Sequence, residues 1–146
     1  MHMYNVKMKL KDTFYGTPTI LGWTRKQDAR ALAYMSTGMA RMRASNGRHY
    51  WYFFMKDINN RDLVRFLMRR NGLVPEFHMS KYYDSDNKQP AFRVHMVDLA
   101  KYNDLLQFTK DIKTFYDSEE KNTADVARYV DRIKTGLNAQ KRQRTK

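Results

Sequence analysis

The dipeptide Asn46-Gly47 is the sequence feature that most restricts how this chain folds. It separates the run from Ala40 to Ser45 from the run from Arg48 to Phe54. Asn-Gly is strongly preferred in the two-residue turn of a tight β-hairpin. Pairing outward from such a turn places Ser45 opposite Arg48, Ala44 opposite His49, Arg43 opposite Tyr50, Met42 opposite Trp51 and Arg41 opposite Tyr52.

This register sorts the hairpin into two different faces, because opposed residues share a face and successive residues alternate between faces. One predicted face is basic and hydroxylated, and it carries Arg41, Arg43, Ser45, Arg48, Tyr50 and Tyr52. The other face is apolar and carries Ala40, Met42, Trp51 and Phe53. A shift by one residue would mix the two sets, so the pattern favours this register.

The remaining elements follow from hydrophobic periodicity and from turn residues. Residues 4–12 alternate apolar and lysine side chains, which predicts a half-buried strand, and residues 13–23 read as a loop. Thr24 is a candidate N-cap for a helix that extends to about Met39, and a second helix is expected between Asn60 and Asn71-Gly72. Helical patterns also cover residues 99–117 and 123–137.

A second hairpin is expected between Pro75 and Asp98. Phe77, Met79, Phe92, Val94 and Met96 form its apolar side. The opposite side is polar, cationic and aromatic, and it holds His78, Ser80, Tyr82, Arg93 and His95. The order of elements predicts an α+β domain over residues 1–137, with helices on one face of an antiparallel sheet and an open basic face. Residues 138–146 are expected to form a disordered basic tail.

The charge of the chain indicates its kind of partner. The formal net charge is +13, and residues 1–56 hold ten Lys or Arg against two acids. The last nine residues hold four Lys or Arg and no acid. This distribution favours a polyanion. The chain has no cysteine, no export signal and no membrane-spanning apolar run, so a cytoplasmic or nucleoid-associated protein is expected, with no membrane partner.

The order of elements from Ala31 to Ile112 resembles one repeat of the LAGLIDADG homing endonucleases. The signature helix of that family ends in an acid followed by Gly, and a β-hairpin follows at once. Here ALAYMSTGMARMR occupies that place, and Gly38 matches the closing Gly. The stretches DLVRFLMRRNGLVPEFHMSKYY and AFRVHMVDLAKYNDLLQF match the helix, hairpin and helix that follow.

The resemblance implies that the sheet lies on the DNA major groove and that signature helices pair in a two-fold dimer. Ala29, Ala33 and Gly38 would then form a homodimer interface. The family's metal-binding acid precedes the closing Gly, and this chain has Thr37 there. A neutral hydroxyl does not replace a carboxylate as a ligand for a hard cation. No catalytic residue, metal site or cofactor is therefore expected.

The first hypothesis is thus a non-catalytic, sequence-specific double-stranded DNA-binding protein, acting as a dimeric transcriptional regulator or repressor. Its DNA-binding residues would be Arg41, Arg43, Ser45, Arg48, Tyr50, Tyr52, His78, Ser80, Tyr82, Arg93 and His95. Three alternatives remain: an RNA-binding, maturase-like protein, an active nuclease whose acids lie elsewhere, and a basic assembly protein without sequence selection. A His78–His95 metal pair is disfavoured, because no cysteine and no HExxH-type spacing accompanies it.

Overall fold

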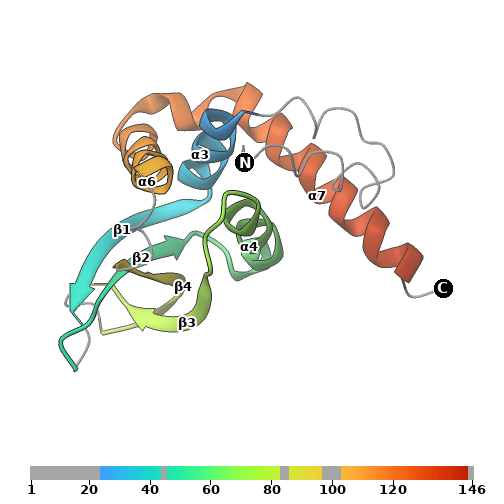
Figure 1. Ribbon diagram of the computed structural model, residues 1–146. Helices are drawn as coiled ribbons and strands as arrows, with labels where there is room; N and C mark the ends of the chain where they lie inside the picture. Colours follow the sequence, from blue (N-terminus) through green and yellow to red (C-terminus); the bar gives the residue numbers. More distant parts are fainter. Residues whose placement is uncertain (1–23, 44–45, 83–85, 97–102, 145–146) are drawn as a thin grey trace.

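The computed structural model describes residues 24–43, 46–82, 86–96 and 103–144. The predicted strand 4–12 and loop 13–23 lie outside these residues, as does Ser45. Four strands form one antiparallel sheet in the order β1-β2-β4-β3. The elements are α3 (Arg25–Tyr34), β1 (Ser36–Arg43), β2 (His49–Met55), η2 (Ile58–Asn60), α4 (Arg61–Arg70), β3 (Glu76–Lys81), β4 (Lys88–His95), α6 (Asn103–Tyr116), η3 (Glu119–Asn122) and α7 (Ala124–Arg144) (Figure 1).

The helices pack on one face of this sheet, which we call the helix-side face. Trp51, Phe53, Phe92 and Val94 point to that face and share one hydrophobic core with residues of α3, α4, α6 and α7. Helix α3 lies in the middle of the helical layer, where it contacts α4, α6 and α7. The predicted α+β architecture with an antiparallel sheet is therefore confirmed.

Helix α3 begins as predicted but ends earlier. Thr24 accepts a hydrogen bond from the Gln27 amide at 3.1 Å, and Gln27 Oε1 accepts one from the Thr24 amide, which completes a capping box. The helix ends at Tyr34, and β1 begins at Ser36, so the predicted extension to Met39 is wrong. The Met35 carbonyl accepts from the Lys56 amide at 2.9 Å, which already ties this part of the chain to the end of β2.

The first hairpin forms, but its predicted register is wrong by one residue. Arg43 pairs with His49, Met42 with Tyr50, and Arg41 with Trp51. Five residues, 44–48, separate Arg43 from His49, and this odd number excludes a two-residue turn. Gly47 has φ of 83°, a left-handed backbone conformation that glycine adopts without steric cost.

The second hairpin has the predicted arrangement of faces. Phe77 pairs with Phe92, and Glu76 pairs with Arg93, so apolar and polar residues fall on opposite sides as expected. Helix α4 also matches its prediction and ends in a Schellman motif. The Leu73 amide donates to the Met68 carbonyl at 3.0 Å, and Gly72 has φ of 87°.

The last helix is longer than predicted. Helix α7 continues from Ala124 to Arg144, past the predicted boundary at residue 137. Its packed side chains are those of the predicted helix, with Val126, Val130 and Ile133 buried in the core. Among the described residues, no helix is both long and apolar enough to cross a lipid bilayer.

Candidate nucleic-acid interface

The second face of the sheet, which we call the helix-free face, carries a different set of side chains. Its residues follow from the pairing of the strands and from the alternation of side chains. They are Gly38, Ala40 and Met42 on β1, Tyr50, Tyr52 and Phe54 on β2, Gln89, Ala91, Arg93 and His95 on β4, and Glu76, His78 and Ser80 on β3. Ala40, Phe54 and Ala91 form a small core there with Met42, Tyr52 and Tyr82, and no described helix contributes to it.

Aromatic rings follow one another along β2 on this face. The ring centroids of Tyr50 and Tyr52 are 6.3 Å apart, and those of Tyr52 and Phe54 are 6.0 Å apart. His95 contacts Tyr50 edge to face at 5.0 Å, and Tyr82 contacts Phe54 in the same way at 4.7 Å. Tyr52, Tyr82 and His95 are half-buried, so each keeps part of its surface open to solvent.

Arg93 provides the charge at the centre of this face. Its guanidinium lies 4.4 Å from the centroid of the Tyr50 ring and 3.2 Å from Glu76 Oε2, which also lies 3.7 Å from His78 Nε2. Partial burial works against the charged form, but hydrogen bonds to Tyr52 and Glu76 and the charge of Glu76 raise the pKa of Arg93. Arg93 is therefore a fixed cation that its own chain already holds in place.

The observed register removes Arg41 and Arg43 from the tyrosine face. Both alternate with Met42, which opposes Tyr50, so the two arginines belong to the helix-side face near the outer end of β1. Arg41 is exposed there, because β1 is an edge strand, and Arg48 is exposed at the turn. Within the described part of the sheet, Arg93 is the only Lys or Arg on the helix-free face, so the prediction of an arginine-rich tyrosine face is wrong.

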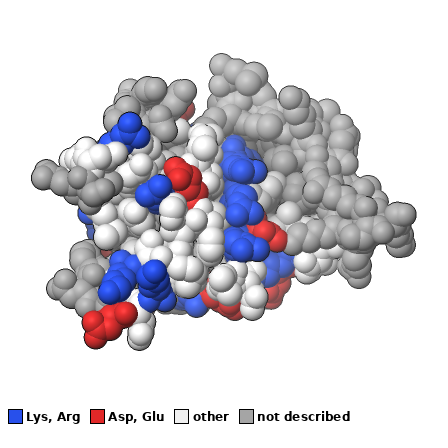
Figure 2. All heavy atoms as spheres, turned by 90° about the horizontal axis from the view of Figure 1, so that it is seen from below, with Lys and Arg blue, Asp and Glu red and all other residues white. Residues whose placement is uncertain are grey.

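The space-filling view agrees with a divided distribution of charge. Figure 2 looks at the molecule from below relative to Figure 1, on the side away from α3 and α6. Lysine and arginine side chains form separate groups on this side, one of them a row, and acidic side chains lie among them. Uncharged surface lies between the groups, so on the described part of this side the cations do not form one continuous patch.

At the end of the helix-free face where β1 begins, the Tyr82 ring lies over Gly38 and closes the face. A Cβ atom added to Gly38 would lie 2.7 Å from the Tyr82 hydroxyl, so the absence of a side chain at Gly38 makes room for this ring. Nearby, the Thr37 hydroxyl lies 3.4 Å from Gln89 Oε1. Thr37 itself is the extra residue of a β-bulge between Ser36 and Gly38. Gly38 therefore does not close a helix, and no sequence signal identified Gln89 as part of this closure.

The two acids nearest to Thr37 in the sequence, Asp28 and Asp57, have structural partners. Asp28 is fully buried, and its oxygens accept from Arg70 Nε at 3.0 Å, from Asn71 Nδ2 at 2.9 Å and from the Tyr129 hydroxyl at 2.8 Å. Burial and the Asp28 carboxylate raise the pKa of Tyr129, which therefore stays a neutral donor. Asp57 caps η2 by accepting from the Asn59 amide at 2.9 Å.

No potential metal centre is found in the described residues. They contain no group of three or more His, Asp or Glu side chains placed to hold one ion. His78 and His95 share the helix-free face but do not come together, because His78 pairs with Ala91, four residues along β4 from His95. Four residues of a strand span about 13 Å.

The predicted dimer residues lie inside the single chain. Ala29 and Ala33 have no exposed surface, and Ala29 belongs to the main core. Gly38 faces Tyr82. A dimer through the small residues of α3 therefore has no free surface to use, since the other helices of the same chain already surround α3.

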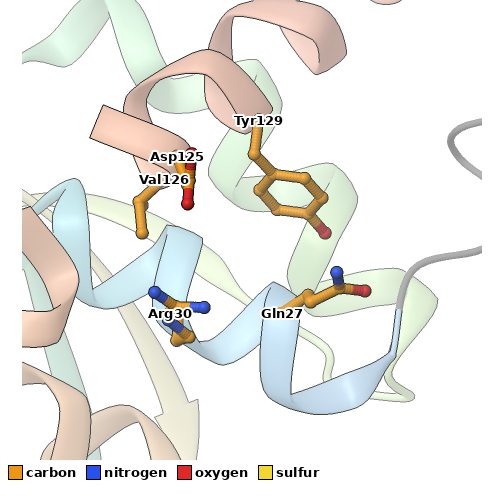
Figure 3. A pocket seen from close by; sticks show the side chains of 5 residues that line it. All are labelled: Gln27, Arg30, Asp125, Val126 and Tyr129. Atoms are coloured by element: carbon orange, nitrogen blue, oxygen red, sulfur yellow. The ribbon is translucent and has the colours of Figure 1, made fainter. Parts of the chain in front are cut away.

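A small cavity of about 80 Å³ lies between α3 and α7, and Figure 3 shows Gln27 and Arg30 facing Asp125, Val126 and Tyr129 across it. The Arg30 guanidinium contacts the Glu120 carbonyl at 3.5 Å and the Thr123 hydroxyl at 3.4 Å. Sites for organic ligands usually enclose roughly 300–1,000 Å³, so this cavity suits a few water molecules.

Comparison with protein-family profiles, with curated proteins and with solved structures finds no match to this chain. The resemblance to homing endonucleases therefore stays a prediction from the sequence pattern.

Proposed function

We propose that this chain is a nucleic-acid-binding domain that holds double-stranded DNA against its helix-free sheet face and does not cut it. The observation that carries the proposal is the separation of the two sheet faces. Helices cover one face. The other face presents Tyr52 from β2 and Arg93 and His95 from the neighbouring strand β4. The net charge of +13 supplies the attraction for a polyanion.

The side chains of this domain divide into two roles. The major groove admits a two-stranded β-ribbon, and polar side chains on such a ribbon reach base edges. Tyr52 and His95 are suited to this role. Arg48, which is exposed at the turn of the first hairpin, is suited to phosphate contacts that set position and affinity. Arg93 would contact a base only by exchanging its contact with Glu76.

Two observations support binding without cleavage. Thr37, at the place where the resemblance expects an acid, has no carboxylate to offer a metal. Asp28, the nearest acid before it in the sequence, is buried and bound by Arg70, Asn71 and Tyr129. A divalent ion at Thr37 would lack a charged oxygen ligand, and one at Asp28 would have to displace Arg70, Asn71 and Tyr129 from the carboxylate.

The run of aromatic rings favours a second candidate, which is binding of single-stranded RNA. Bases stack on exposed aromatic side chains of sheets, at about 1–3 kcal/mol per base. Tyr52, Tyr82 and His95 are the half-buried rings that could stack in this way. The two candidates share one surface and differ in the ligand that binds it.

The test compares two histidines on opposite faces. A duplex selected by the protein from a random pool, a random duplex and single-stranded RNA are titrated against wild type, His95→Ala and His49→Ala. His95 lies on the helix-free face, whereas His49 pairs with Arg43 on the other face and is equally half-buried. We expect His95→Ala to weaken the selected duplex roughly tenfold, within the 1–3 kcal/mol of one base contact, and His49→Ala to have little effect.

The same samples test cleavage. With Mg²⁺ or Mn²⁺ added, we expect the duplex to remain intact. Equal effects of the two histidine variants would exclude the helix-free face, and tighter binding of RNA than of any duplex would favour the second candidate. Metal-dependent cutting by the pure protein would show that the chain is a nuclease.

A further inference from the structure

Two lysines far apart in the sequence lie over the rings of Tyr34 and Tyr116, which flank the start of β1. Lys56 directly follows β2, and its amide donates to the Met35 carbonyl at 2.9 Å. Lys121 lies in η3. The Lys56 ammonium is 5.1 Å from the centroid of the Tyr34 ring, and the Lys121 ammonium is 3.9 Å from that of Tyr116. The tyrosine rings attract and position the two ammonium groups but leave their charge uncompensated.

No carboxylate neutralises this pair in the part of the chain that is described. The ion pairs there join other residues, and neither Glu119 nor Glu120, the acids just before Lys121, bonds to either lysine. Burial and the charge of Lys121 lower the pKa of Lys56. The two like charges therefore repel each other in the free protein, and an anion bound between them would relieve that repulsion.

The lysine pair adjoins the closed end of the helix-free face. The Tyr116 hydroxyl, on the residue whose ring carries Lys121, donates to the Thr37 carbonyl at 2.5 Å. The Thr37 side chain in turn approaches Gln89 of β4. A nucleic acid that lies along the helix-free face and passes this end would bring its backbone toward the two ammonium groups.

We propose that Lys56 and Lys121 form a binding site for one phosphate group of the nucleic-acid backbone. The proposal rests on the proposed function for the source of the phosphate, and on the uncompensated cation pair for the site itself. Two lysines act as point charges and do not require the fixed geometry of a bidentate arginine contact. The site would position the nucleic acid along the face without reading its sequence.

A purely structural role for Lys56 makes a different prediction. The Lys56 ammonium lies near the C-terminal end of α3, whose last turn has no basic residue, and a cation there stabilises a helix. A structural lysine would lower the unfolding free energy when replaced but would leave the salt dependence of nucleic-acid binding unchanged. The two roles therefore separate in one set of variants.

The first experiment measures the affinity for a fluorescent 20-base-pair duplex between low and moderate salt. Lys56→Gln/Lys121→Gln is compared with Lys110→Gln/Lys113→Gln, which removes the same charge from exposed positions of α6. We expect only the first variant to reduce the slope of log affinity against log salt, by about 0.9 for one phosphate group that is no longer bound. Equal slopes in the two variants would overturn the site.

The second experiment tests the site without nucleic acid. Lysines are labelled with ¹³C-methyl groups, which keep their charge, and inorganic phosphate is added during NMR. We expect the signals of Lys56 and Lys121 to shift and those of Lys110 and Lys113 to stay. We also expect Lys121→Gln to raise the pKa of Lys56 toward its ordinary value. Uniform shifts of all four lysines, or no shifts, would overturn the site even if the protein binds the duplex. If phosphate shifts only Lys56 and Lys121 but the protein binds no duplex, the site stands and only the proposed function is overturned.

Discussion

The role of Asp28 in the structure differs from the role that the sequence alone suggests. In the sequence it is one of two acids before Asp57, so it is a natural candidate for a catalytic carboxylate. In the structure it joins α3 to α4 and α7, through Arg70, Asn71 and Tyr129. Asn71 also donates to the Leu67 carbonyl at 2.7 Å, which fixes the orientation of its amide. The carboxylate therefore organises three helices and has no surface for a substrate.

We expect Asp28→Asn to lower the free energy of unfolding by about 3–5 kcal/mol, because it leaves the buried Arg70 charge without its partner. The control is Asp104→Asn, which removes an exposed carboxylate 3.9 Å from Arg25 and should cost about 0–1 kcal/mol. Urea denaturation followed by circular dichroism measures both. Similar values for the two variants would contradict the structural role of Asp28.

Most elements were predictable because their ends carry local signals. The Thr24 N-cap, the Asn71-Gly72 helix stop and the alternation of the second hairpin all appear in the structure as the sequence indicates. Each depends on interactions between residues a few positions apart. Local chemistry is strong enough to specify them, and the α+β architecture follows from their order.

The errors lie where local preference competes with the rest of the sheet. Asn46-Gly47 favours a two-residue turn, but the chain adopts an odd loop that places Ala40 and Met42 opposite Tyr52 and Tyr50. In this register Met39 packs on the main core and Ala40 and Met42 pack in the small core of the helix-free face, and the turn dipeptide alone indicates neither contact. The Thr37 bulge and the early end of α3 likewise depend on the pairing of Ser36 with Met55. As a result, the arginines of the predicted site fell on the wrong face.

Helix α3 behaves in the structure as a central core helix. Asp28, Ala29, Ala31, Leu32 and Ala33 are all buried, so the helix has partners around most of its circumference. We therefore expect Ala33→Glu to lower the midpoint of thermal unfolding markedly, because it buries an unpaired charge. Lys26→Glu, at an exposed position of the same helix, is the control and should have little effect. A stably folded Ala33→Glu monomer, obtained from a dimeric wild type, would show that α3 is an interface after all.

At the scale of the whole molecule, the structure separates packing from charge. The helical layer and the helix-side face hold nearly all of the described core, whereas cations lie around the edges, at the first hairpin turn, beside β1 and along the outer parts of the helices. Lys56 and Lys121 illustrate why sequence reasoning missed part of this arrangement. Neither has a motif, and only folding packs η3 against α3, whose C-terminal end meets Lys56. The net charge predicts a polyanionic partner, and the fold determines where that partner can bind.

The basic C-terminal segment gives a test of whether cations outside the packed core set the affinity for nucleic acid. Helix α7 continues to Arg144, and residues 138–146 carry Lys141, Arg142, Arg144 and Lys146 without an acid. The packed residues Val126, Val130 and Ile133 precede this segment, so its removal should leave the core intact. We expect deletion of residues 138–146 to weaken selected and random duplexes by the same factor. The salt slope should fall by about 0.9 for each phosphate group that the shortened protein no longer binds. Replacing the four cations by Gln keeps the length and should reproduce both effects in a salt titration. Weaker binding of the selected duplex alone would instead place these residues in sequence readout.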